Sequence, residues 1–82
     1  MNTTSDRFTA MIGERIQAAR KLAEMTQEQL SAYLNFKDRQ ILANIEAGKR
    51  KVSTEELLKF MQVLKRPLDF FTDPYVIAEP NA

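Results

Sequence analysis

Cysteine and histidine are both absent from this sequence of 82 residues, and glycine and proline are scarce, with two and three copies. Without cysteine there is no disulfide to hold a fold and no thiolate nucleophile. Without histidine the chain lacks the commonest acid-base group at neutral pH, and the two absences together remove the usual zinc ligands. No glycine-rich phosphate loop or spaced set of carboxylates replaces them. We therefore expect no catalytic residue, no metal and no cofactor, which argues against an enzyme.

Long hydrophobic runs are also missing. No stretch of the sequence approaches the roughly 20 consecutive apolar residues that span a bilayer. The polar start, Met1 to Asp6, lacks the apolar core of a signal peptide. We expect a cytoplasmic protein without membrane contact, and the length suits one domain with one small core.

Charge is unevenly distributed, although the formal net charge is only +1. Residues 1–66 hold all 12 basic and eight of the 11 acidic residues and so carry +4, whereas the remainder is acidic. The densest basic cluster is Lys49-Arg50-Lys51. A weakly basic body with one such cluster is compatible with phosphate contacts at specific points. Charge alone, however, favours a solvated loop.

Apolar residues recur at three- and four-residue spacing along most of the chain, which predicts an all-α fold. The apolar faces are expected to include Phe8 in the first helix, Tyr33 in the second and Leu58 in the fourth. We predict five helices, at about Arg7 to Ala23, Thr26 to Leu34, Arg39 to Ala47, Ser53 to Leu64 and Leu68 to Phe71.

Several helix ends carry recognisable signals. Thr26 with Gln29, and Ser53 with Glu56, have the spacing of a capping box, in which the side chain of each residue accepts a hydrogen bond from the backbone N–H of the other. Asp38 is a good N-cap for the third helix. Asn35 and Gly48 follow the second and third helices, where a left-handed residue often ends a helix. Together these signals fix the boundaries of two short consecutive helices, Thr26 to Leu34 and Arg39 to Ala47.

Two short helices joined by a tight turn, with a helix before and another after, form the organisation of a DNA-reading helix-turn-helix. The stretch 12–71 resembles the XRE, or Cro/lambda-repressor-like, family. The resemblance implies a compact five-helix lambda-repressor-like domain over residues 1–74, with the helix-turn-helix at the second and third helices and a tail at 75–82. It rests on Ile12-Gly13-Glu14-Arg15-Ile16 through Arg20-Lys21, Thr26-Gln27-Glu28-Gln29-Leu30, Ile45-Glu46-Ala47-Gly48-Lys49-Arg50, Glu56-Leu57-Leu58 and Leu68-Asp69-Phe70-Phe71.

The turn departs from the common family pattern. Between Leu30 and Glu46 the chain is one residue longer, and Phe36-Lys37-Asp38-Arg39-Gln40 resembles a subgroup whose turn has that sequence. The extra residue affects the tilt of the third helix. Ile41 consequently has two interpretations, a contact with a thymine methyl group or a place in the core, and we favour the core.

The resemblance implies a role for each polar segment. The third helix would enter the major groove and read bases with Arg39, Gln40, Ala43 and Asn44, because Arg pairs with guanine and Gln or Asn with adenine. An ion pair between Arg15 and Glu46 would brace that helix. Gln27, free of the capping box, would contact the DNA backbone. The full set of expected phosphate contacts is Gln27, Lys37, Lys49, Arg50 and Lys51.

The end of the domain has more large apolar residues than a small core needs. Some must complete the core, and others are expected to form a dimer face or bind a protein partner. The candidates are Phe70, Phe71, Tyr75, Val76 and Ile77.

A repressor that binds an inverted repeat of double-stranded DNA as a homodimer is the function we predict, because paired recognition helices read both halves of a palindrome. Three alternatives stay open on the same fold: an antitoxin, a protein-interaction module, and a controller of a restriction-modification system.

Overall fold

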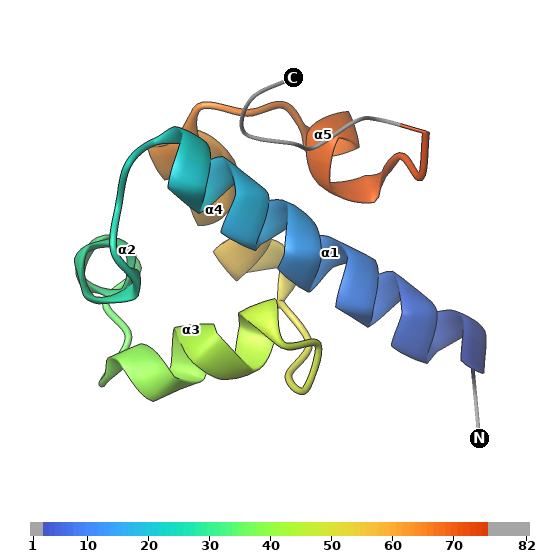
Figure 1. Ribbon diagram of the computed structural model, residues 1–82, viewed down its shortest axis with the longest axis horizontal. Coiled ribbons are helices and arrows are strands. Elements are labelled where there is room, and N and C mark those ends of the chain that lie inside the picture. The colour runs from blue at the N-terminus through green and yellow to red at the C-terminus, as the bar shows by residue number, and fades with distance from the viewer. Residues whose placement is uncertain (1–2, 76–82) are drawn as a thin grey trace.

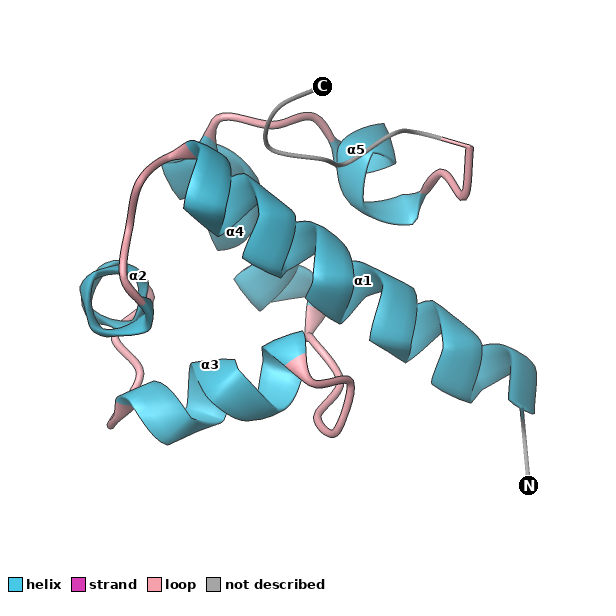
Figure 2. Cartoon of the chain, in the orientation of Figure 1, coloured by secondary structure: helices cyan, strands magenta, loops and turns pink. Residues whose placement is uncertain are grey.

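Helices and loops alone make up the part of the chain that the computed structural model describes, residues 3–75, with side chains described from Asp6 onward. The all-α prediction is confirmed, since no β-strand occurs in that range (Figure 2). The elements are α1 (Thr3–Leu22), α2 (Gln27–Tyr33), α3 (Arg39–Glu46), α4 (Thr54–Leu64) and α5 (Leu68–Thr72). Each lies close to its predicted place, although α1 begins four residues earlier than expected.

Both predicted capping boxes are present. The Thr26 hydroxyl accepts from the Gln29 backbone N–H at 3.0 Å, and the Gln29 side chain accepts from the Thr26 N–H at 2.9 Å. Ser53 and Glu56 repeat this arrangement at the start of α4, at 3.1 and 2.9 Å. Satisfied donors at these ends explain why α2, with only seven residues, begins at a sharply defined place.

The ends of α2 and α3 also follow the sequence signals. Asn35 has φ of 59° and Gly48 has φ of 76°, so both adopt the left-handed conformation that ends a helix. The Asp38 side chain accepts from the Gln40 N–H at 2.9 Å and caps α3. Two further left-handed residues were not predicted: Glu24 in the turn after α1, and Lys65, which caps the C-terminal end of α4.

The core lies between α1 and the helices packed around it. Helix α1 crosses the molecule, with α3 along one side and α5 along the other, and α4 lies behind it (Figure 1). Phe60 of α4 and Phe71 of α5 are the largest fully buried side chains. The buried apolar residues are Ile12, Ile16, Ala19, Leu30, Leu34, Leu42, Ile45, Phe60, Leu64 and Phe71.

Three residues expected on the apolar faces lie largely outside. Tyr33 is 61% exposed, Leu58 55% and Phe8 47%. In α2 the inward face is already filled by Leu30, Ser31 and Leu34, which turns Tyr33 towards solvent. These predictions were wrong because each helix buries only a narrow stripe and leaves adjacent apolar residues outside it.

A close approach of α1 and α3 sets the position of α3 in the molecule. Gly13 of α1 is buried, and a Cβ atom at Gly13 would overlap the carbonyl oxygen of Ile45 and lie 3.1 Å from that of Glu46. Only glycine lets the α1 backbone come this near to the C-terminal end of α3. The same end of α3 carries Glu46, which belongs to the candidate site.

Candidate nucleic-acid interface

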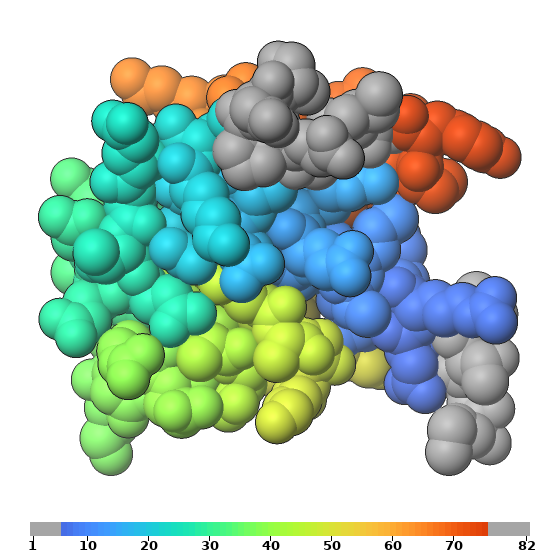
Figure 3. Space-filling view, in the orientation of Figure 1, coloured from blue at the N-terminus to red at the C-terminus, as the bar shows by residue number. Residues whose placement is uncertain are grey.

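Helix α3 lies along one edge of the molecule, with one side at the surface (Figures 1 and 3). It buries Leu42, Ile45 and Glu46 towards α1 and α2. Arg39 and Gln40 are exposed at its start, and Ala43 and Asn44 are half-buried one turn later. The four predicted base-reading residues are therefore accessible in the folded chain and lie on the solvent side of one short helix.

The polar residues of this face are partly paired with each other. Gln40 Nε2 donates to Asn44 Oδ1 at 3.2 Å, one helical turn away. This hydrogen bond is exposed, so a base edge could replace it at little cost. Ile41, beside them, is half-buried and packs against the core, in agreement with the interpretation we favoured.

The predicted ion pair between Arg15 and Glu46 is wrong. Glu46 pairs instead with Arg20. The Arg20 Nε donates to Glu46 Oε2 at 2.7 Å, and its Nη2 donates to Oε1 at 3.0 Å. The side chains are only 11% and 2% exposed for Arg20 and Glu46. Arg20 also donates to the Met25 carbonyl at 2.9 Å, so it ties the C-terminal end of α1, the following turn and α3 together.

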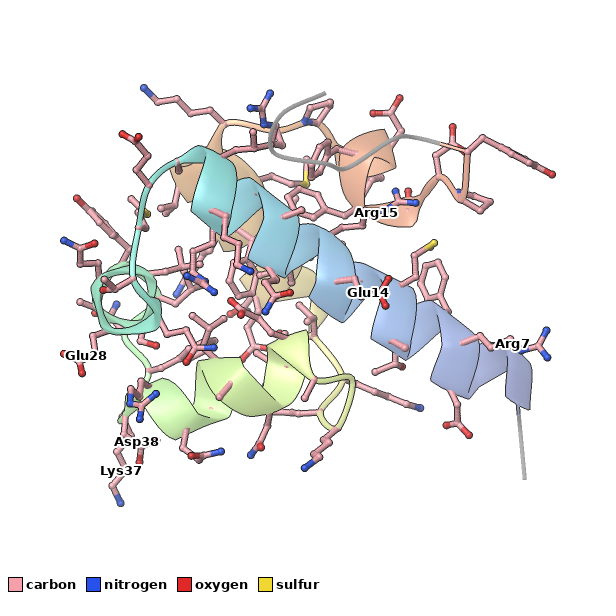
Figure 4. The ribbon with its side chains drawn as sticks, viewed as in Figure 1. Arg7, Glu14, Arg15, Glu28, Lys37 and Asp38 are labelled. Carbon is pink, nitrogen blue, oxygen red and sulfur yellow. The ribbon has the colours of Figure 1, made fainter. Side chains whose placement is uncertain are left out.

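Arg15 performs a different structural role. It donates to the carbonyl oxygens of Phe70 and Asp73 at 2.8 and 2.7 Å, in and just after α5, and its side chain points towards that helix (Figure 4). Positions five residues apart on an α-helix differ in direction by about 140°. Because α1 packs against both α3 and α5, Arg15 and Arg20 face different neighbours. Their spacing alone could have predicted that the two arginines point in different directions, but the sequence does not say which helix each one contacts.

Gln27 is not free, contrary to the prediction. Its Nε2 donates to Glu46 Oε1 at 3.1 Å, and its Oε1 accepts from Arg39 at 3.3 Å. A chain of contacts thus runs from the buried Arg20–Glu46 pair through Gln27 to the first residue of α3. Arg20 is the residue of this network whose role was not predicted from the sequence.

The basic loop after α3 contains two kinds of cation. Lys49 and Lys51 are exposed, as is Lys37 just before α3 (Figure 4). Arg50, in contrast, makes a two-pronged pair with Glu56 at 2.9 and 3.0 Å, and its guanidinium lies 5.7 Å from the centre of the Phe36 ring.

The pair has the expected electrostatic consequence. Hydrogen bonding to Arg50 lowers the pKa of Glu56 below its ordinary value, with a smaller contribution from the Ser53 backbone. The Glu56 carboxylate in turn raises the pKa of Arg50. Through its contacts with Glu56 and Phe36, Arg50 connects the loop after α3 to the start of α4 and to the turn before α3.

The predicted dimer candidates divide into four groups. Phe71 is fully buried in the core, so its assignment to a dimer face is wrong. Phe70 is half-buried and packs edge-on against Phe71. The Arg66 guanidinium lies over the Phe70 ring, 5.5 Å from its centre. Tyr75 is 91% exposed. Val76 and Ile77 lie outside the described residues.

Residues 3–75 contain neither a cluster of metal ligands nor a membrane-spanning helix. No group of three or more carboxylates there could hold a metal ion. None of the helices in that range has both the length and the apolar character needed to cross a bilayer.

Comparison with known proteins gives one match. A family model described as helix-turn-helix matches residues 16–71, from the middle of α1 to α5. Neither a curated protein nor a solved structure matches the chain. The matched segment contains both short helices, the turn between them and the helices on either side, and it covers more than half of the sequence. Its fold agrees with that of a lambda-repressor-like domain, and the chain belongs to the helix-turn-helix family.

Proposed function

We propose that this protein is a sequence-specific repressor that binds an inverted repeat in double-stranded DNA as a homodimer. Family membership supports DNA binding and transcription regulation. The main support for sequence-specific binding is the exposed polar face of α3, whose opposite face is buried in the core. A rigid helix with exposed polar side chains at its start fits the major groove of B-DNA.

The residues at the start of α3 supply the chemistry of base recognition. Arg39 has the paired donors that match guanine O6 and N7, and Gln40 and Asn44 have the donor and acceptor that match adenine. Ala43 is small enough to leave room for a thymine methyl group. Each good pairing discriminates against the wrong base by about 1–3 kcal/mol.

Exposed lysines would hold the helix in register. Lys37 precedes α3, and Lys49 and Lys51 follow it, so they flank both ends of the reading helix. Phosphate contacts of this kind fix the position of a protein on the duplex without reading its sequence. Arg50 is a weaker candidate than its neighbours because Glu56 already occupies its guanidinium.

Dimerisation would place two copies of α3 on successive turns of the major groove. The surface we propose for it contains half-buried Phe70 and exposed Tyr75, together with Val76 and Ile77 beyond the described range. A two-fold dimer is the commonest symmetric assembly, and it matches a palindromic site. Repression follows most simply, because a bound dimer blocks other proteins without a further contact surface.

The test is selection of bound duplexes from a random pool, followed by the same selection with Arg39→Ala and Gln40→Ala. The parent is expected to select an inverted repeat, and each variant to relax the preference at defined bases. Gln62→Ala, on the exposed surface of α4, serves as the control and should select the parent's sites. Unchanged sites for both α3 variants would reject the base-reading assignment. A parent that prefers no duplex would instead favour the protein-interaction alternative.

A further inference from the structure

Gln27 lies between a buried carboxylate and an exposed guanidinium. Together with Arg20, Thr26, Glu28 and Arg39 it lines a shallow hollow between the starts of α2 and α3. On the inner side its Nε2 contacts Glu46 Oε1 at 3.1 Å. On the outer side its Oε1 contacts the Arg39 guanidinium at 3.3 Å.

The orientation of the Gln27 amide is dictated by Glu46. An ionised carboxylate only accepts hydrogen bonds, so the group that Gln27 turns towards it must be the NH2. Glu46 itself is fixed, because Arg20 contacts both of its oxygens in a region closed to solvent. The Gln27 carbonyl oxygen must then point outward, and it offers Arg39 an acceptor.

An outward carbonyl oxygen is poorly suited to bind DNA phosphate, since both groups are acceptors. A phosphate contact through the NH2 of Gln27 would require breaking the hydrogen bond to the buried Glu46. Arg39, by contrast, gains from the contact. A long, flexible side chain that is held before binding loses less freedom when it pairs with a base.

We infer that Gln27 is a positioning residue for Arg39, and that the buried Arg20–Glu46 pair sets base specificity through it. The inference rests on the proposed function. Loss of Gln27 should weaken discrimination at the base pair that Arg39 reads and leave discrimination elsewhere unchanged. A direct phosphate contact would behave differently, because its loss lowers affinity for all duplexes alike.

The experiment is a double-mutant cycle with Gln27→Met, Arg39→Ala and the double variant. Methionine keeps the length of the side chain and removes both the donor and the acceptor. Affinities are measured for the duplex that the parent selects and for its three single-base changes at the position where Arg39→Ala relaxes preference. Gln27→Met should reduce discrimination there about three- to tenfold, and should have no further effect on it when Arg39 is already alanine.

Two controls separate positioning from folding. Gln62→Met makes the same exchange on exposed α4 and should leave discrimination unchanged. The motion of the Arg39 guanidinium, measured by NMR relaxation in the free parent, should be more restricted than that of exposed Arg7. This second measurement needs no variant and applies even if Gln27→Met does not fold. Equal mobility of the two arginines would overturn the inference.

The remaining outcomes distinguish this inference from the proposed function. A parent without sequence preference would overturn both. A selective parent in which Gln27→Met lowers affinity equally for all duplexes, in both backgrounds, would leave the proposed function intact and make Gln27 a phosphate contact. Full discrimination by Gln27→Met would likewise overturn the positioning role alone.

Discussion

Ser31 and Ser53 have the same side chain but opposite hydrogen-bonding states. Ser31 is buried in α2, and its hydroxyl has no hydrogen-bond partner within the described part of the chain. Ser53 is exposed, and its hydroxyl caps α4 by accepting from Glu56. A buried polar group without a partner costs free energy, whereas a capping hydroxyl stabilises the helix that it begins.

Alanine at these two positions should therefore change stability in different directions. Ser31→Ala is expected to leave the free energy of unfolding unchanged or to raise it by up to about 1 kcal/mol. Ser53→Ala, the matched control, should lower it by about 1 kcal/mol. Urea unfolding followed by circular dichroism measures both. A clear loss of stability in Ser31→Ala would mean that its hydroxyl is satisfied, for instance by a buried water.

Glu56 should make stability depend on pH in the acid range. Its pKa is lowered in the folded chain, chiefly by Arg50, so its contribution is complete above the ordinary value of 4.5 and is lost as the pH falls through the lower folded value. The effect is modest, since the Arg50 side chain is 40% exposed and water screens the pair. Melting temperatures between pH 6 and pH 3, roughly the range in which carboxylates titrate, should fall less steeply for Glu56→Gln than for the parent. Parallel curves for the two proteins would contradict the assignment.

At the scale of the elements, the contact between α1 and α3 is the most demanding one. Gly13→Ala would place a methyl group against the backbone of Ile45 and Glu46, and backbone cannot move aside as a side chain can. We expect a loss of about 3 kcal/mol or more, at the upper end for overpacking. Glu14→Ala, one residue further on and exposed (Figure 4), should change stability by less than about 0.5 kcal/mol. Denaturant titration of both variants gives the comparison, and similar stabilities would show that α3 can shift away from α1.

The boundaries of α2 and α3 and the start of α4 could be predicted because their signals are local. A capping box needs only residues three apart, as at Thr26 and Ser53, and a left-handed residue such as Asn35 or Gly48 ends a helix whatever packs around it. The exposed polar start of α3 follows from the same local pattern, since the apolar residues Leu42 and Ile45 fix which side turns inward.

The pairing of elements could not be predicted from local signals. Sequence spacing leaves open whether Arg15 or Arg20 meets Glu46, because the answer depends on how α1 is rotated against two neighbours at once. The burial of Phe71 and the exposure of Tyr33 depend on the same rotations and on how little surface a small core can cover. Gln27 was misjudged for a related reason. Because Thr26 and Gln29 form the capping box, the side chain of Gln27 was expected to have no partner. Its partner Glu46 lies 19 residues further along the chain, in α3.

On the scale of the whole molecule, the three exposed lysines that flank α3 share one edge with it. The loop that carries Lys49 and Lys51 projects beside the C-terminal end of α3, and Lys37 lies beside its start (Figures 1 and 4). The molecule measures 32 × 29 × 19 Å across its principal axes, so a single copy covers only a short length of duplex. Phosphate contacts at both ends of α3 would fix its angle in the groove.

The Lys49-Arg50-Lys51 cluster offers a test in which adjacent cations should behave differently. Log affinity falls as log salt concentration rises, and each lysine that contacts phosphate adds about one to the steepness of that fall. Lys49→Ala and Lys51→Ala should therefore each make the slope shallower by about one, with stability unchanged. Arg50→Ala should instead lower stability, because it removes the ion pair with Glu56 and the contact with the Phe36 ring, and it should alter the salt slope least. Affinity for duplex DNA over a series of salt concentrations, with a thermal melt of each variant, separates the two effects. If Arg50→Ala changes the slope as much as the lysine variants do, the guanidinium leaves Glu56 on binding and contacts phosphate itself. The ion pair would then belong only to the free protein.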